Sequence, residues 1–381
     1  MTPDERARSG YADTVREIGQ QPATWEQTAA DMSHRSAPLA AFLRENGAAR
    51  NPIVLTGSGS SLYVAECLAS SLQARLGVVV RPIPAAMLLT DLDGCINPGD
   101  APLVVSFARS GDSPESTAVL DLLLEKFPQC RHLTITCNAA GKLAVAYAHD
   151  PRVMTVVLDP RTNDRSLVMT SSFTNMIVAG QVLGYLADTS AYQRSVALLA
   201  TLVRKLLAGS TGDLARVARL RFRSACFLGT GPRLGAAREC ALKMLEMSGG
   251  ETGTIAETPL GLRHGPMAAV RDDTLVVAGI PSSPLARGYA VDVLREIRQK
   301  RPGARMVIVG DVMPADLIAD GDVAVLLPEL QAIDDGGAAV VDTIVGQVLA
   351  LFRCLAAGLR PDGPSPDGII NRVVPEFRIY R

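Results

Sequence analysis

The fold of this chain can be inferred from the segment Leu55-Thr56-Gly57-Ser58-Gly59. A matching segment, Phe227-Leu228-Gly229-Thr230-Gly231, stands in the second half of the chain. The strand-like run Leu275-Val276-Val277 follows its counterpart Leu103-Val104-Val105 by the same offset that separates Gly229 from Gly57. An offset shared by two separate motifs is the signature of an internal duplication. The sequence therefore predicts two tandem copies of one fold, each about 150 residues long.

Short β-branched runs alternate with longer stretches of helical periodicity along the chain. In the first copy, strands are predicted at 53–56, 78–83, 103–107, 133–136 and 153–158, and helices at 62–76, 117–127 and after Ser171. This alternation predicts an α/β protein in which helices cover both faces of a parallel sheet.

The pattern divides the chain into four segments. We expect a helical lead-in at 1–50, a first domain at 51–205, a second domain at 215–365 and a C-terminal tail at 366–381. The charged helical stretch Gln193–Arg223 would join the two domains.

The composition excludes several classes of protein. The 38 basic residues are balanced by 39 acidic ones, which argues against a nucleic-acid binder or a protein held on membranes by basic residues. The start, Met1–Gly10, lacks the apolar core of a secretion signal. Asp342, Gln347 and Arg353 interrupt the apolar stretch Ala338–Gly358, which indicates a buried helix rather than a membrane span. We therefore expect a cytoplasmic protein.

The residue types that can bind metals or form disulfides, cysteine and histidine, are scattered along the chain. The seven cysteines form no CxxC pair, and the four histidines do not cluster. This pattern predicts reduced thiols, no disulfide framework and no metal site.

The segment Ala108–Ser116 is the strongest local indication of a binding site. Ser113 fits a helix N-cap and is followed by Pro, so the positive end of a helix would face the loop. Ser110 and Ser113 add hydroxyl donors and Arg109 adds a full charge, which suits a phosphate monoester. The second copy has Ala278–Pro284 at this place, so one anion site per chain is expected, in the first domain. The alternative is an ordinary capped helix.

Further hydroxyl groups stand at other strand ends of the first copy. Gly57–Ser61 does not fit a dinucleotide fingerprint, because Leu62 occupies the place of the third glycine, and no GK[ST] of a P-loop is present. Ser60 and Ser61 fit better as donors directed at the same crevice beyond the strand ends. The stretch Thr162–Thr174 is also polar where a packing element would be apolar.

The second copy carries candidate proton-transfer groups. Glu239, Lys243 and Glu246 share one face of a predicted helix with the sequence ECALKMLE. The alternative is a solvated stripe of ion pairs. His264 is a lone histidine in the turn Gly261–Pro266, and such a residue is more often structural than catalytic.

With these motifs the chain resembles a known family. The two copies look like sugar isomerase (SIS) domains, and their motifs are similar to SQSGET, ALKLKE and LKHGP in the isomerase part of glucosamine-6-phosphate synthase. The chain more closely resembles the tagatose-6-phosphate ketose/aldose isomerase group, also described as galactosamine-6-phosphate deaminase/isomerase. The motifs of that group are SFARSGxSPES, TNDRSxxMTSSFTNM, LGxRHGP and a terminal NRVV. The matching segments here are Ser106–Ser116, Thr162–Met176, Leu260–Pro266 and Asn371–Val374, together with the lead-in Gln20–Thr28.

The resemblance implies the details of the fold. Each of the two tandem SIS domains would be a parallel five-stranded sheet flanked by helices, in three αβα layers of the flavodoxin-like type. A helical N-terminal lead-in would precede them.

The resemblance also implies roles for individual residues. Those that would bind the sugar phosphate are Ser61, Arg109, Ser110 and Ser113. Those that would line the sugar are Ser60, Thr170, Ser171 and Ser172. Glu246 would be the enolising base, with Lys243 one turn before it, and His264 would open the sugar ring from a neighbouring subunit. These roles imply a homodimer or larger homo-oligomer that needs no cofactor and no metal.

Two departures from the synthase narrow the function. The chain has no glutaminase domain with its N-terminal cysteine nucleophile, which argues against glutamine-fed synthesis. No lysine follows Lys300, so the tail has none to form the Schiff base that the synthase forms with the ketose.

The sequence therefore predicts an amino-sugar-phosphate deaminase/isomerase that converts galactosamine 6-phosphate to tagatose 6-phosphate and ammonia. The alternatives are a plain ketose/aldose phosphate isomerase, a glucosamine-6-phosphate deaminase and a non-catalytic sugar-phosphate sensor. Glu246 and His264 argue against a sensor, because phosphate binding needs neither. The partner is a small-molecule sugar phosphate, with no nucleic acid and no membrane.

Overall fold

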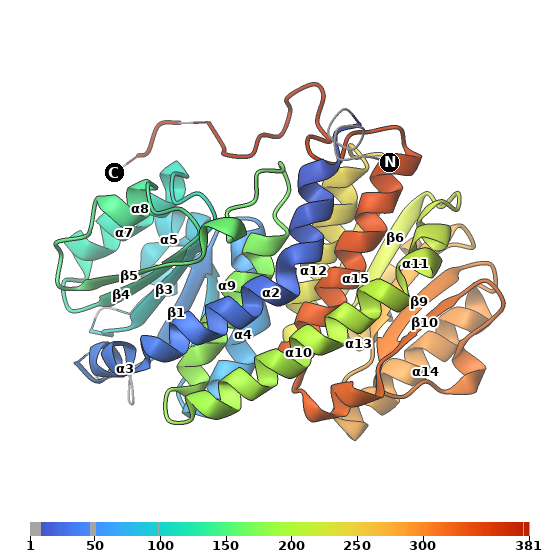
Figure 1. Cartoon of the computed structure of the whole chain (residues 1–381), viewed down its shortest axis with the longest axis horizontal. Coiled ribbons are helices and arrows are strands. Elements are labelled where there is room, and N and C mark those ends of the chain that lie inside the picture. Colours follow the sequence, from blue (N-terminus) through green and yellow to red (C-terminus); the bar gives the residue numbers. More distant parts are fainter. Residues whose placement is uncertain (1–8, 46–50, 98, 376, 381) are drawn as a thin grey trace. The chain divides into compact units, whose positions relative to one another are not determined.

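The computed structural model describes residues 9–45, 51–97, 99–375 and 377–380, and Figure 1 shows the course of the chain. The chain divides into two compact units, each assembled from several segments. Unit 1 comprises residues 1–22, 166–168 and 198–367, and unit 2 comprises residues 23–165, 169–197 and 368–381. The lead-in residues 1–8 and 46–50 and the tail residues 376 and 381 lie outside the described part.

Unit 2 contains the first sheet, whose five parallel strands lie in the order β2-β1-β3-β4-β5. The strands are β1 (Ile53–Gly57), β2 (Val80–Pro84), β3 (Leu103–Ala108), β4 (Arg131–Thr136) and β5 (Val153–Val157). The helices that follow the strands are α4 (Ser60–Leu76), α5 (Ala85–Thr90), α6 (Leu92–Cys95), α7 (Pro114–Lys126), α8 (Lys142–Val145), the short η1 (Pro160–Thr162), α9 (Ser171–Gln181) and η2 (Val182–Tyr185).

Helices cover both faces of this sheet (Figure 1). On one face Val54 and Val104 form a buried cluster with Leu88 of α5 and Leu123 of α7. On the other face α4 and α9 pack against the strands and against each other. A Cβ on Gly180 of α9 would lie 2.4 Å from a methyl group of Leu68 of α4, so this glycine leaves room for the Leu68 side chain.

The lead-in consists of α2 (Ala12–His34) and α3 (Ser36–Glu45), and α2 contributes buried polar contacts to unit 2. The indole Nε1 of Trp25 donates to Thr174 Oγ1 at 2.9 Å, and Thr28 Oγ1 donates to Asn175 Oδ1 at 2.8 Å. The Asn175 amide in turn donates to Thr24 Oγ1 at 2.9 Å. Because buried polar groups need partners, these bonds fix the position of this part of α2 on α9.

Unit 1 contains the second sheet, whose five parallel strands lie in the order β10-β9-β8-β6-β7. The strands are β6 (Ser224–Leu228), β7 (Gly253–Glu257), β8 (Thr274–Gly279), β9 (Arg305–Gly310) and β10 (Val323–Leu326). The helices are α11 (Thr211–Ala218), α12 (Pro232–Met247), α13 (Pro259–Leu262), α14 (Pro284–Lys300), α15 (Asp335–Ala356) and the short η3 (Pro266–Ala269), η4 (Ala315–Leu317) and η5 (Pro328–Ala332). The helix α10 (Thr189–Gly209) crosses from unit 2 into unit 1.

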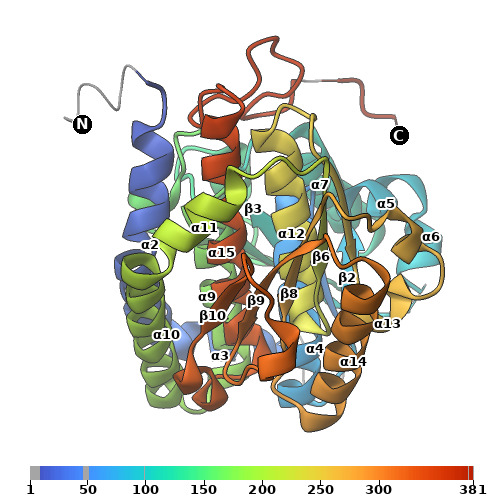
Figure 2. The ribbon, with the colours of Figure 1, turned by 90° about the vertical axis from the view of Figure 1, so that its right-hand side faces the viewer.

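The second sheet repeats the order of the first, strand for strand, and Figure 2 shows it with α14 packed on it. Val291, Leu294 and Ile297 of α14 cover one face together with Leu262 of α13. Elsewhere in the unit α15 packs against both α12 and α11. The predicted fold class is therefore confirmed: α/β, with two tandem five-stranded parallel sheets flanked by helices.

The duplicated glycine turn has the same geometry in both copies. Gly59 has φ 55° and ψ −127°, and Gly231 has φ 59° and ψ −128°. A Cβ on Gly57 would lie 2.6 Å from Ser61, and one on Gly229 would lie 2.1 Å from the carbonyl oxygen of Arg233. Each pair of glycines thus lets a helix begin immediately against the end of the first strand of its sheet.

The helix α15 is long and apolar enough to cross a membrane, with a hydropathy of 1.7 over its most apolar window. However, 78% of that window is buried within the protein itself. The stretch expected as a buried helix at 338–358 is thus largely part of a core helix at Asp335–Ala356, which is not a convincing membrane span.

His132 is a buried titratable group on β4, with 1% of its surface exposed. Neither ring nitrogen has a hydrogen-bond partner within the described residues. Burial, and secondarily the positive charge of Arg152, lowers the pKa of His132 to about 4. The folded state therefore holds this ring neutral while the unfolded chain takes up a proton below pH 6.5.

We expect the contribution of His132 to stability to be complete above pH 6.5 and to fall by about 3 kcal/mol as the pH drops to 4. His132→Leu should remove this part of the pH dependence, measured as urea unfolding free energy from pH 7 to pH 4.5. His149→Gln serves as the control, because His149 is exposed. An unchanged slope in His132→Leu would contradict the assignment.

Candidate functional site

The loop between β3 and α7 in unit 2 combines several groups that bind anions. Arg109 and Ser110 are buried, each with 8% of its surface exposed. Gly111 turns the chain with a φ of 69°, a left-handed conformation that favours glycine. Ser113 is the N-cap of α7, as predicted, but its side chain makes no capping hydrogen bond. The loop therefore presents a guanidinium, hydroxyls and the positive end of a helix.

This loop is held in place by the segment that follows β4. The amide of Asn138 donates to the carbonyl oxygen of Ser110 at 2.8 Å. The backbone N–H of Lys142 donates to the carboxylate of Asp112 at 2.9 Å. A Cβ on Gly141 would lie 2.3 Å from the same Ser110 oxygen, so glycine permits the contact. Asp112, which would repel a phosphate, thus directs its charge at the 138–142 segment.

Ser60 and Ser61 begin α4 and are 5% and 6% exposed. They follow β1, and Arg109 and Ser110 follow β3, which is the neighbour of β1 in the sheet. Because the carboxyl ends of parallel strands meet at one edge, both sets of residues lie at the same edge of the first sheet. The structure therefore brings these predicted phosphate and sugar residues to one end of unit 2.

The predicted sugar-lining residues are organised by one carboxylate that the sequence did not single out. Asp164 is fully buried and accepts the backbone N–H groups of Thr170, Ser171 and Ser172 at 2.7, 3.0 and 2.9 Å. It also accepts the hydroxyls of Thr170 at 3.2 Å and Ser172 at 2.6 Å. Asp164 thus fixes the start of α9, and the contact of these residues with a sugar stays a prediction.

The corresponding place in the second sheet is filled by an ion pair. Arg233 is the counterpart of Ser61 in the duplication and is 2% exposed. Its Nε and Nη2 donate to the carboxylate of Asp342 on α15 at 2.6 and 2.7 Å, and its Nη1 donates to the carbonyl oxygen of Ile280. A Cβ on Gly279 would collide with both members of the pair. The guanidinium therefore occupies the space beyond the strand ends of this copy.

The helix α12 in unit 1 carries a buried row of charged groups. Lys243 is 1% exposed, and its Nζ lies 2.5 Å from Glu246 Oε2 and 3.3 Å from Glu239 Oε1. Glu239 is fully buried, whereas 21% of the Glu246 side chain is exposed. The row is therefore not a solvated stripe: one ammonium lies between two carboxylates, and Glu246 is the member that solvent can reach.

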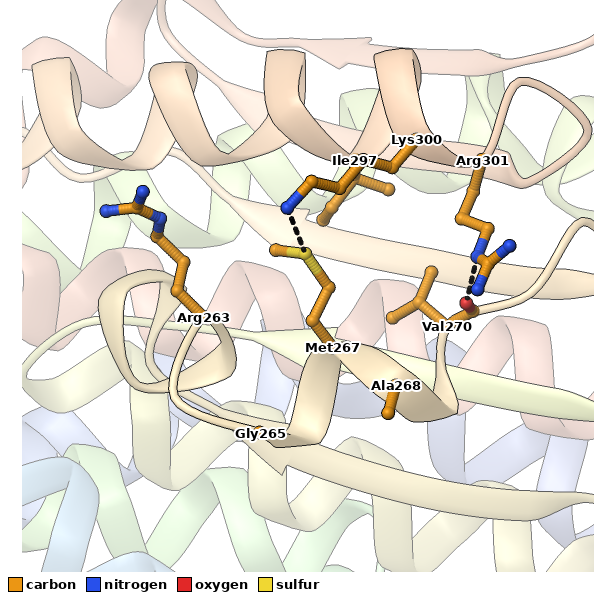
Figure 3. A pocket seen from close by; sticks show the side chains of 8 residues that line it. All are labelled: Arg263, Gly265, Met267, Ala268, Val270, Ile297, Lys300 and Arg301. Atoms are coloured by element: carbon orange, nitrogen blue, oxygen red, sulfur yellow. Dashed lines mark hydrogen bonds between the residues drawn. The ribbon is translucent and has the colours of Figure 1, made fainter.

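His264 lies in the exposed loop after α13. The loop is attached to α14, because Arg263 pairs with Glu296 of that helix at 2.8 Å. Within α14, Lys300 pairs with the same Glu296 at 2.5 Å. Arg301 also donates to the carbonyl oxygen of Val270 at 2.8 Å. Figure 3 shows a cavity of about 490 Å³ between this loop and α14, lined by these three cations.

The imidazole of His264 makes no hydrogen bond or ion pair within the described residues. Its loop is thus fixed from one side while the ring stays open to solvent. Groups of three or more histidine, cysteine or acidic residues that could hold a metal are absent from the described part of the chain.

Comparison with known proteins assigns the chain to a family. An AgaS protein of Streptomyces coelicolor is 38% identical over 364 residues, which cover 95% of this chain and 93% of that protein. The chain belongs to the AgaS family. D-galactosamine-6-phosphate deaminase AgaS of Escherichia coli is 33% identical over 370 residues, covering 95% and 94% of the two chains. No protein-family model matches the chain.

Solved structures agree with the AgaS assignment. Tagatose-6-phosphate ketose/aldose isomerase from Escherichia coli has a TM-score of 0.85 at 30% identity and covers 92% of this chain and 95% of that one. A crystal structure from Clostridium novyi has a TM-score of 0.94 at 28% identity, covering 100% and 98%. The resemblance to this isomerase and deaminase group is thereby confirmed.

Two features of this AgaS-family site were missed by sequence reasoning. Asp164 appeared only as part of a polar stretch, because its five acceptor contacts depend on the return of the chain at 170–172. The pair of Arg233 and Asp342 joins residues far apart in sequence. Here a signal existed: the duplication aligns Arg233 with Ser61, and Asp342 interrupts an otherwise apolar helix.

We expect Asp164→Asn to lower the free energy of unfolding by about 3 kcal/mol. The side-chain NH2 group of asparagine would face the buried backbone N–H groups of residues 170–172, and these donors would lose an acceptor. The measurement is the urea midpoint, with hydrogen exchange of α9 as the local probe. Asp159→Asn is the matched control, since its carboxylate pairs with the half-exposed Arg161 and should change stability by about 0–1 kcal/mol. Equal effects of the two substitutions would contradict the capping role of Asp164.

Proposed function

We propose that this chain is an enzyme that converts galactosamine 6-phosphate to tagatose 6-phosphate and ammonia. The observation that carries the proposal is the row on α12, where buried Lys243 pairs with the partly exposed carboxylate of Glu246. Its relative from Escherichia coli is a D-galactosamine-6-phosphate deaminase, matched over nearly the whole length of both chains. A second candidate, ketose/aldose isomerisation without deamination, is favoured by the name of the solved Escherichia coli structure.

Phosphate binding anchors the substrate. Arg109 supplies the charge, Ser61, Ser110 and Ser113 supply hydroxyl groups, and the first turn of α7 supplies backbone N–H groups. The Ser113 hydroxyl supports this role, because it is not used to cap its own helix. Ser60 and Thr170–Ser172 lie at the same edge of the sheet as candidates for contact with the sugar.

Two residues would carry out the proton transfers of the reaction. His264 takes the proton from O1 and gives one to the ring oxygen as the ring opens and the C1 aldehyde forms. Glu246 takes the proton from C2 while O1 takes up a proton, which gives an enolamine. Glu246 then returns a proton to C1 as the nitrogen loses one. The ammonium of Lys243 beside Glu246 supplies a positive charge that stabilises negative charge developing near this carboxylate.

The last step releases ammonia. Proton return to C1 leaves an imine at C2, and water adds to this carbon. The carbon–nitrogen bond then breaks, so that the carbonyl of the ketose forms and one ammonia leaves for each water consumed. The overall reaction consumes one water and needs no oxidant, reductant or nucleotide. The imine nitrogen is the amino group that the substrate carries on C2.

We further propose that the working enzyme is a cytoplasmic homodimer or larger homo-oligomer. The support is the exposed, unbonded ring of His264, on a loop held by α14. Such a ring is available to a neighbouring subunit.

The decisive experiment measures ammonia release from galactosamine 6-phosphate and glucosamine 6-phosphate, with C2 hydrogen exchange in deuterated water. Wild type should release ammonia from the galactosamine compound. Glu246→Gln should reduce both ammonia release and exchange by about 10²–10⁴, because glutamine cannot accept the C2 proton. Glu251→Gln is the control, since Glu251 is an exposed residue just after the same helix.

The outcomes separate the candidates. Ketose formation without ammonia would identify a plain isomerase. Faster ammonia release from glucosamine 6-phosphate would identify a glucosamine-6-phosphate deaminase. Binding of sugar phosphates without turnover would identify a sensor. Full exchange in Glu246→Gln would show that the base lies elsewhere.

The shared-site arrangement predicts complementation between inactive variants. In a mixed dimer of Glu246→Gln and His264→Gln, one of the two sites would regain both wild-type groups. Activity should therefore recover to about half of the wild-type value per dimer. The mixed dimers are isolated with two affinity tags and assayed for ammonia. No recovery in such dimers would mean that His264 serves its own chain.

A further inference from the structure

The C-terminal tail makes specific contacts with the anion-binding end of unit 2. The side chain of Arg372 donates from Nε to the backbone oxygen of Asp164 at 2.7 Å and from Nη2 to Asn163 Oδ1 at 2.6 Å. The backbone oxygen of Arg372 accepts a hydrogen bond from Nη2 of Arg109. The red segment in Figure 1 is this tail. One residue of the tail thus contacts both the loop at 163–164 and the guanidinium of the phosphate loop.

The contact with Arg372 uses a single donor of the Arg109 guanidinium. A guanidinium has five N–H donors, and the carbonyl oxygen of Arg372 takes one of them. A neutral carbonyl does not cancel the charge. The contact therefore restricts the orientation of Arg109 without neutralising it.

The side chain of Arg372 determines where its own carbonyl lies. Its two hydrogen bonds attach the tail to Asn163 and Asp164, and the carboxylate of Asp164 holds the first residues of α9. Asp164 is fully buried, so this attachment point is rigid. The tail is thereby fixed to the same loop that orders residues 170–172.

We propose that Arg372 is a positioning residue that orients Arg109 for the substrate phosphate. This inference rests on the proposed role of Arg109 in phosphate binding. Arginine loses considerable side-chain freedom when it is fixed, and here the tail fixes it before the phosphate arrives. Affinity for phosphate therefore depends on Arg372, although Arg372 makes its own hydrogen bonds to protein groups.

The test measures binding of inorganic phosphate by calorimetry, and KM and kcat for galactosamine 6-phosphate. Arg372→Ala should weaken phosphate binding and raise KM by about 10-fold, with kcat within about two-fold of wild type. Arg372→Lys should be similarly impaired, because an ammonium cannot reproduce the two directed bonds of the guanidinium. Arg378→Ala is the control: it removes the same charge from an exposed position of the same tail.

A double-mutant cycle with Arg109→Ala distinguishes positioning from other roles. If Arg372 acts through Arg109, the double variant should bind phosphate as weakly as Arg109→Ala alone. The inference would be overturned if the two substitutions had additive effects on phosphate affinity. It would also be overturned if Arg372→Lys kept full function or if Arg372→Ala bound phosphate as wild type does. Failure of the phosphate site itself gives a different result, because Arg109→Ala would then bind phosphate like wild type.

Discussion

The close approach of a strand to the helix that follows it is the constraint on which both halves of this protein depend. At Gly57 and Gly229 a side chain would collide with the first turn of the next helix, and Gly59 and Gly231 adopt backbone angles that favour glycine. The turn places the N-terminus of α4 against the end of β1 and that of α12 against the end of β6. Ser60 and Ser61 on α4, and the charged row on α12, owe their positions to it.

The two copies have used this common geometry differently. In unit 2 the space beyond the strand ends is bordered by Arg109, small hydroxyl residues and the start of α7. In unit 1 the side chain of Arg233 fills the equivalent space and is neutralised by Asp342. A buried arginine needs such a partner, because an unpaired charge is costly to bury. Divergence at a single aligned position, serine in one copy and arginine in the other, therefore fits one anion site per chain.

Much of the architecture could be predicted because its causes are local in the sequence. The constant offset between the two copies, the β-branched runs and the glycine turns predict the two parallel sheets without any knowledge of long-range contacts. The helical spacing of Glu239, Lys243 and Glu246 likewise predicts that they share a face. Burial of that face could not be predicted, because it depends on which elements pack on α12 in the folded chain. One of them is α15, which approaches so closely that a Cβ on Gly346 would lie 2.2 Å from Cys240 of α12. This burial is what distinguishes the row from an ordinary surface stripe.

By itself the sequence determined the repeat, the fold class, the polar loop at 108–116 proposed to bind an anion and the spacing of the charged row, because each depends on residues close together along the chain. The tertiary structure alone decided which carboxylates are buried and which residues the tail contacts. Asp164 collects five hydrogen bonds only after the chain returns at 170–172, and Arg109 meets Arg372 across 263 positions of sequence. Hydrogen bonds of this kind depend on the meeting of separate segments, and no local pattern of residues encodes that meeting.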